Sequence, residues 1–81
     1  MTLDVRMQDI LAERSRSGQL RGEMPYEPGM VAADVVRREG FSGAEARAIV
    51  VMVNSQQATD DTPLSDGDTV ELVTQMVGGG A

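Results

Sequence analysis

The apolar and polar positions in the first quarter of the chain predict two strands. Leu3–Met7 alternates apolar and polar side chains, which is the period of a strand with one buried face. Leu20–Tyr26 alternates more weakly, and Pro25 within it favours an edge strand or the end of the strand because proline has no amide hydrogen to donate. Ile10–Ala12 breaks the alternation between the two strands and predicts a short helical turn before a polar loop. On the second strand, we expect one face to carry Leu20, Gly22, Met24 and Tyr26 and the other to carry Arg21 and Glu23.

A helix is predicted from about Met30 to Glu39, because apolar residues there recur at helical spacing. Its apolar face consists of Val31, Val35 and Val36. Gly40 is a suitable C-cap, since glycine tolerates the left-handed conformation in which many helices end. Arg37, Arg38 and Glu39 lie at the polar end of this helix, and we expect the two arginines to form a cap and a solvated face.

The second half of the chain predicts two further strands. Ala48–Val53 is a continuous run rich in β-branched residues, which predicts a central strand covered on both faces. A polar connection at residues 57–61 and a tight turn at Asp66-Gly67 follow. Thr69–Val77 then alternates. Its expected inward side chains are Val70, Leu72, Thr74 and Met76, and its outward ones are Glu71, Val73, Gln75 and Val77.

The order strand, strand, helix, strand, turn, strand predicts an α+β fold. It favours a mixed sheet of four or five strands packed on one main helix, with the last strand beside the first. A chain of 81 residues is long enough for a single domain. We place this domain at residues 1–77 and a C-terminal tail at residues 78–81.

The composition excludes several classes of function. The chain has no cysteine and no histidine, so thiol nucleophiles, thiolate metal sites and histidine-based catalysis are excluded, and an enzyme is the least favoured class. The formal net charge of −6 opposes binding to nucleic acid and favours a basic protein partner. No apolar stretch is long enough to span a membrane and no signal-peptide pattern begins the chain, so we expect a cytoplasmic protein.

The chain ends in Gly78-Gly79-Gly80-Ala81, directly after the last predicted strand. Glycine has no Cβ, so such an arm could thread a narrow channel and present its terminal carboxylate to a partner enzyme. A linker remnant or a loose end is the plain alternative. Val73 and Val77 lie on the predicted outer face near the tail, where they are expected to dock a partner, although isolated surface valines also occur without a function.

Several motifs together resemble the small sulfur-carrier proteins of the ThiS and MoaD type. In the second half of the chain, the resemblance rests on the strand ending in Val53-Asn54, on the turn Leu64-Ser65-Asp66-Gly67-Asp68, on Val70-Glu71-Leu72 and on the C-terminal glycines. The first half is similar in the strand Val5-Arg6-Met7, in Ile10-Leu11 and in Pro28-Gly29 before the helix. These carriers are ubiquitin-like β-grasp domains, so the resemblance implies this fold for the whole chain.

The resemblance also implies a function as a sulfur carrier. An E1-like adenylyltransferase would use ATP to adenylate the carboxylate of Gly80, and a sulfur donor would then displace AMP and leave a thiocarboxylate. A sulfur-accepting synthase would use that sulfur to make thiamine, a molybdenum or tungsten cofactor, or a sulfur amino acid such as homocysteine. Gly78 and Gly79 would thread the active site of the partner. The carrier itself would be a monomer when free and would bind no cofactor or metal.

Ala81 departs from the pattern of this family, because carriers competent for activation end in Gly-Gly. Some relatives carry extra residues that a zinc metalloprotease of the JAMM type removes, so Gly80-Ala81 is predicted to be a processed bond. Such extended carriers imply sulfur amino acid synthesis, whereas a cloning residue or a harmless extension is the alternative for Ala81. Two other functions are compatible with the same fold. One is a ubiquitin-like modifier whose activated tail is attacked by a lysine, and the other is a binding module that does not use its tail.

Overall fold

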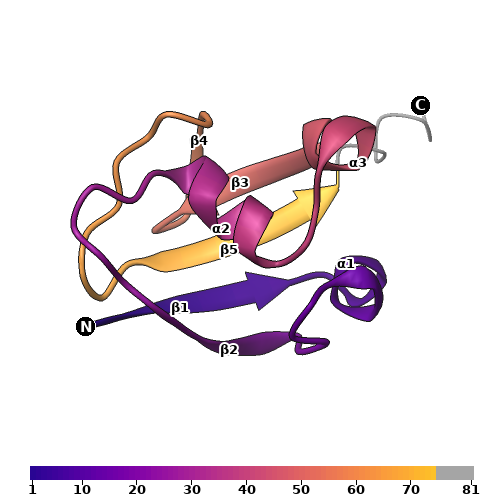
Figure 1. Ribbon diagram of the computed structural model, residues 1–81, viewed down its shortest axis with the longest axis horizontal. Coiled ribbons are helices and arrows are strands. Elements are labelled where there is room, and N and C mark those ends of the chain that lie inside the picture. The colour runs from indigo at the N-terminus through magenta and orange to yellow at the C-terminus, as the bar shows by residue number, and fades with distance from the viewer. Residues whose placement is uncertain (75–81) are drawn as a thin grey trace.

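The computed structural model describes residues 1–74, in which five strands form one mixed sheet packed on a helix (Figure 1). In chain order the elements are β1 (Thr2–Met7), α1 (Asp9–Arg14), β2 (Arg21–Pro25), α2 (Ala32–Arg38), α3 (Gly43–Arg47), β3 (Ile49–Val53), β4 (Gln56–Ala58) and β5 (Thr69–Thr74). The strand order is β2-β1-β5-β3-β4. β5 runs parallel to β1, and the other neighbouring strands are antiparallel. The α+β fold is therefore the predicted one, with the last strand beside the first.

The core lies between α2 and one face of the sheet. In the parallel pair of strands, Val5 lies opposite Val70 and Met7 opposite Leu72, and alternation directs these side chains to the same face. Burial of each such side chain contributes about 1.5–3 kcal/mol. The buried apolar residues are Leu3, Val5, Met7, Leu11, Ala12, Met24, Met30, Ala32, Val35, Val36, Phe41, Ile49, Val51, Leu64, Val70 and Leu72.

Ala48–Val53 contains β3, which is an interior strand as predicted because it pairs with a neighbour on each side, but the prediction that this strand is covered on both faces is wrong. β5 is the middle strand, and β3 lies between β5 and the edge strand β4. Ile49 and Val51 are buried against the helical layer, whereas Val50 and Met52 are half-buried on the other face. The apolar run therefore combines a core-facing row with an apolar row on the outer face.

α2 is shorter than the predicted helix, and its two ends differ from the prediction. Val31 precedes the helix in an extended conformation and forms an isolated bridge with Pro63, so it does not belong to the helical face. Glu39, at the polar end of the predicted helix, is only 5% exposed. It is buried because its carboxylate accepts hydrogen bonds from the amide of Ser17 at 3.2 Å and from the hydroxyl of Ser17 at 3.3 Å. Gly40 has φ +92°, as expected of a C-cap.

Two short elements, α3 and β4, are absent from the prediction. β4 occupies part of the expected polar connection, and it pairs with β3 through Val51 and Ala58. Elements of three to five residues carry too little periodicity to be recognised locally. Leu20 precedes β2 and is exposed, so it does not share the burial of Met24, with which the sequence groups it on one face. β2 is an edge strand, as Pro25 indicates.

Candidate functional site

The outer face of the sheet, turned away from α2, carries an apolar cluster. Val73 of β5 points to this face, as predicted, and its register partner on β3 is Val50. Met52 follows on β3 opposite Glu71. All three apolar side chains are half-buried. We call Val50, Met52 and Val73 the open-face cluster. The sequence predicts only Val73 on the outer face, because Val50 and Met52 belong to a continuous apolar run in which alternation does not distinguish the two faces.

Charged side chains border the open-face cluster on the side of β1. Arg6 lies opposite Glu71 in the register, and its Nη2 is 3.0 Å from Asp4 Oδ2. Arg21 Nη2 of β2 is 3.5 Å from the same carboxylate oxygen. An apolar centre beside a charged margin is the usual composition of a protein–protein interface. The outer face is therefore chemically suited to dock a protein.

The end of β5 is fixed by neighbours on both sides. The amide of Thr74 donates to Gln8 Oε1 at 2.9 Å, and the amide of Gln8 donates to the carbonyl of Leu72 at 3.3 Å. On the other side Thr74 pairs with Ile49 of β3. These hydrogen bonds fix β5 as far as Thr74, the last described residue. This end of the strand lies at the end of the molecule where α1 and α3 are found (Figure 1). Val77 and the predicted tail sites, Gly78, Gly79, Gly80 and Ala81, lie outside the described residues.

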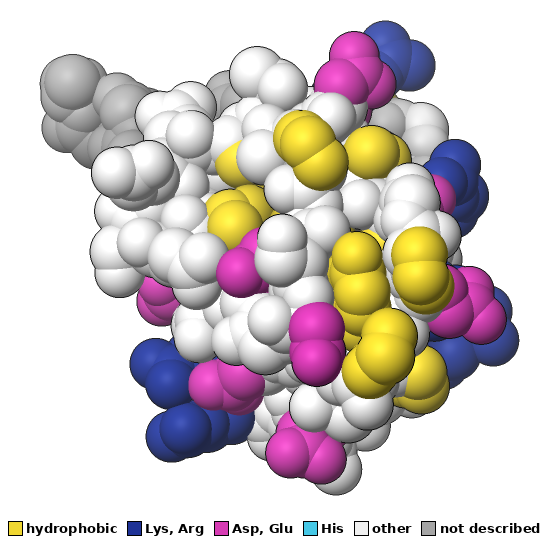
Figure 2. All heavy atoms as spheres, turned by 90° about the vertical axis from the view of Figure 1, so that its left-hand side faces the viewer, with side chains coloured by type: hydrophobic (Ala, Val, Ile, Leu, Met, Phe, Trp, Pro, Cys, Tyr) yellow, Lys and Arg dark blue, Asp and Glu magenta, His cyan; other side chains and the backbone are white. Residues whose placement is uncertain are grey.

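The turn motif at the opposite end of β5 is structural. The carboxylate of Asp68 accepts the amide of Ser65 at 2.8 Å, and Asp66 accepts the amide of Thr2 at 3.0 Å. Gly67 has φ +86°, which confirms the tight turn. Figure 2 shows the end of the molecule that includes the N-terminus, with acidic and apolar side chains intermingled. These contacts fix the start of β5.

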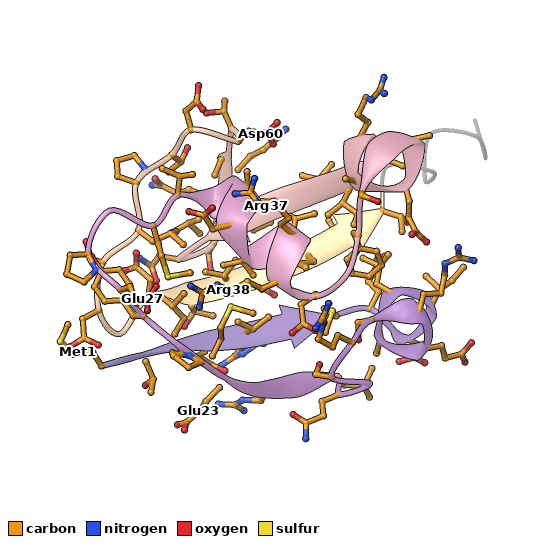
Figure 3. All side chains as sticks on the ribbon, in the orientation of Figure 1. Met1, Glu23, Glu27, Arg37, Arg38 and Asp60 are labelled. Carbon is orange, nitrogen blue, oxygen red and sulfur yellow. The ribbon has the colours of Figure 1, made fainter. Side chains whose placement is uncertain are left out.

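A hollow of about 550 Å³ lies on the helical side of the molecule, between α2, α3 and β3. Arg37 of α2 and Asp60 of the loop after β4 line it (Figure 3). Within residues 1–74, no group of three or more acidic side chains is placed to hold a metal ion. The described part of the chain therefore presents an apolar outer face and an anchored strand end. None of the helices in residues 1–74 is long and apolar enough to cross a membrane.

Comparison with known proteins agrees with this arrangement. The sequence model of the ThiS family matches residues 8–80, which is most of the chain. Two crystal structures of small archaeal modifier protein 1 (SAMP1) from Haloferax volcanii resemble the fold, each with a TM-score of 0.71. Their sequences are 17% and 16% identical, over 91% and 90% of this chain and 94% and 95% of theirs.

A putative molybdopterin converting factor subunit 1 from Pyrococcus furiosus is also similar in structure, with a TM-score of 0.65 and 19% identity. The match covers 91% of this chain and 97% of that one. At these identities the structural matches show the ubiquitin-like fold alone. No curated protein sequence matches the chain significantly.

Proposed function

Because this chain belongs to the ThiS family, whose members are small sulfur carriers and not catalysts, we propose that Gly80 is its activated residue. The observation that carries the proposal is the anchored end of β5. A strand fixed by Gln8 on one side and Ile49 on the other leads, within six residues, to Gly80. A rigid strand followed by a thin glycine arm suits delivery of a carboxylate into the active site of another protein.

The proposed reaction proceeds in two steps on the partner enzyme. A carboxylate oxygen of Gly80 attacks the α-phosphate of ATP and displaces pyrophosphate, which forms an acyl adenylate. A sulfur nucleophile then attacks the carbonyl carbon, AMP leaves, and a thiocarboxylate results. A carboxylate is a poor electrophile, so the energy of the mixed anhydride drives the second step. The chain supplies the acyl group, and ATP belongs to the E1-like partner.

Ala81 would have to be removed before this activation. While Ala81 is present, the terminal carboxylate is displaced by one residue and has a methyl group beside it, which a channel shaped for glycine would reject. We propose hydrolysis of the Gly80-Ala81 bond by a metalloprotease of the JAMM type. Such an extended carrier favours delivery of the sulfur to sulfur amino acid synthesis.

The open-face cluster supports a docking role for the outer face of the sheet. In this role Val73, and Val77 beyond it, would contact the activating enzyme while Gly78 and Gly79 occupy its channel. Sulfur-accepting synthases would use the same face in turn, because each must receive the same tail. Family members in general interact with E1-like enzymes and synthases.

A second candidate function is that of a ubiquitin-like protein modifier. The two H. volcanii structures favour it, since both belong to a protein named a small archaeal modifier. The same activated Gly80 would then be attacked by a lysine amine of another protein in place of sulfide. Covalent adducts on other proteins would distinguish this outcome from sulfur transfer.

The proposal is tested with the E1-like enzyme encoded in the same genome. Three chains are compared by ATP–pyrophosphate exchange: one ending at Ala81, one ending at Gly80, and one ending at Gly78 as the control. We expect exchange only with the chain that ends at Gly80, and its intact mass should show replacement of one oxygen by sulfur when a sulfur donor is added. Equal exchange by all three chains, or none by any, would contradict the proposal.

A further inference from the structure

Two large apolar side chains are exposed at the end of the molecule where β5 stops. Ile10 of α1 is 51% exposed and Leu20, just before β2, is 54% exposed. Within residues 1–74 only Met1, at the other end of the sheet, is a more exposed large hydrophobic residue. Exposed apolar side chains gathered in one region commonly mark a surface that binds a partner.

The topology brings both side chains to the end from which the tail leaves. β5 is parallel to β1 and β2 is antiparallel to it, so β1 and β5 end where β2 begins (Figure 1). The carbonyl of Leu20 accepts the amide of Met7 at 2.9 Å. Gln8, which follows Met7 in the chain, accepts a hydrogen bond from the amide of Thr74 with its side-chain oxygen. Ile10 follows in the first turn of α1.

The core does not require either side chain. α1 is packed through Leu11 and Ala12, each 4% exposed, and Arg14 ties it to Glu45 of α3 through an ion pair. Leu20 contributes its backbone carbonyl to the sheet, while its side chain is directed to solvent. Selection for folding alone therefore does not explain a leucine and an isoleucine at these two positions.

The charges around Ile10 indicate the chemistry of the partner. Asp9 and Glu13 are exposed on α1 on either side of it, and neither forms an ion pair with another residue of the described chain. A complementary surface would be apolar opposite Ile10 and Leu20, with lysine or arginine opposite the two carboxylates.

We propose that Ile10 and Leu20 form a second docking surface, which contacts a basic and apolar rim around the channel of the adenylating enzyme. The inference rests on the proposed function, since it is that function which brings the tail into such a channel. Contact at the rim would orient the strand end before the glycines enter. The open-face cluster and this surface would then hold β5 from two sides.

The test is the double variant Ile10→Ser/Leu20→Ser of the chain ending at Gly80, assayed by ATP–pyrophosphate exchange with the E1-like enzyme of the same genome. We expect KM to rise about tenfold with kcat nearly unchanged, because a contact made equally in the ground and transition states affects binding alone. Pro28→Ser, at an exposed apolar position near the opposite end, is the matched control and should leave KM unchanged. Circular dichroism should show that both variants are folded.

The outcomes separate this inference from the proposed function. If the unsubstituted chain supports no exchange, the proposed function is wrong and the docking surface is wrong with it. If it supports exchange and the double variant has the same KM, only the docking surface is wrong. In a second measurement, Asp9→Asn/Glu13→Gln should reduce the rise of KM with salt, and an unchanged salt dependence would overturn the assignment of a basic rim.

Discussion

The side-chain amide of Asn54 links the turn after β3 to the turn before β5, through its nitrogen and its oxygen. Its Nδ2 donates to Asp68 Oδ1 at 2.9 Å, and its Oδ1 accepts the amide of Thr69 at 3.0 Å. The residue has φ +51°, a left-handed conformation that asparagine adopts more easily than most residues. The hairpin between β3 and β4 is thereby fixed to the start of β5.

We expect Asn54→Ala to lower the free energy of unfolding by about 2 kcal/mol, because it removes two hydrogen bonds and leaves a Cβ residue at positive φ. Asn54→Gly is the matched variant. It loses the same bonds but tolerates this φ, so it should cost less than alanine. Urea unfolding of the three chains measures the difference, and a glycine variant less stable than the alanine variant would contradict the account.

Asp34 gives the protein a part of its acid sensitivity. Its pKa is lowered from the usual 3.8, chiefly by the hydrogen bond from the amide of Val31, which is 2.9 Å long, and further by Arg37. The folded state therefore favours the ionised carboxylate. The resulting stabilisation is fully present above the unfolded pKa and is lost as the pH falls through the lower folded value.

Replacement of this carboxylate should have an effect that depends on pH. We expect Asp34→Asn to lower the free energy of unfolding by about 0.5–1 kcal/mol at pH 7, since it removes a charge from the first turn of α2. The difference from the wild type should shrink below pH 4 and vanish at still lower pH. Unfolding by urea between pH 7 and pH 2 measures it. Asp61→Asn, in an exposed loop, removes the same charge away from α2 and is the matched control.

At the scale of elements, β5 has a core-facing row of side chains and an outer row for which we propose a role in docking. Val70 and Leu72 are completely buried against α2. Val73 lies on the opposite face of the strand, in the open-face cluster. Strand alternation makes this division possible, because neighbouring residues point to opposite faces. Substitutions on the two faces should therefore have different consequences.

We expect Val73→Glu to raise the KM of the chain for the adenylating enzyme at least tenfold, because it places a carboxylate in the apolar centre of the proposed interface. The free energy of unfolding should fall by less than about 1 kcal/mol, since the position is half-exposed. Gln56→Glu on the edge strand β4 introduces the same charge and should change neither quantity. A similar loss of binding in both variants would indicate a general charge effect and not a docking face.

At the scale of the whole molecule, acidic residues outnumber basic residues. All 13 acidic and 7 basic residues lie within residues 1–74, so the globular domain carries the whole net charge of −6. A domain of this charge approaches a basic partner under electrostatic attraction, which salt screens. The tail itself contributes no charged side chain.

This charge predicts a salt dependence of the encounter with the activating enzyme. We expect KM in ATP–pyrophosphate exchange to rise as salt increases from about 50 mM to 500 mM, while kcat stays nearly constant, because screening slows association more than it affects the bound complex. The measurement uses the chain that ends at Gly80. A KM that is independent of salt would show that the acidic surface has no part in recognition.

Much of the fold could be predicted from the sequence, because periods of 2 and 3.6 residues are local properties. Leu3–Met7 and Thr69–Thr74 alternate visibly, the valines of α2 recur at helical spacing, and Gly67 marks its turn. The glycine arm and its resemblance to sulfur carriers are likewise readable in the chain, and the ThiS family match agrees with that reading.

Only the tertiary structure decided which of these residues meet. The pairing of β5 with β1 depends on residues far apart in the chain, and no local pattern shows that β5, and not β3, is central. The burial of Glu39 depends on a loop that supplies Ser17, and the exposure of Leu20 depends on where β2 begins. The open-face cluster likewise depends on the pairing of β3 with β5, which places Val50 opposite Val73. A continuous apolar run specifies that residues are hydrophobic, but strand order and helix placement determine which of them stay accessible to a partner.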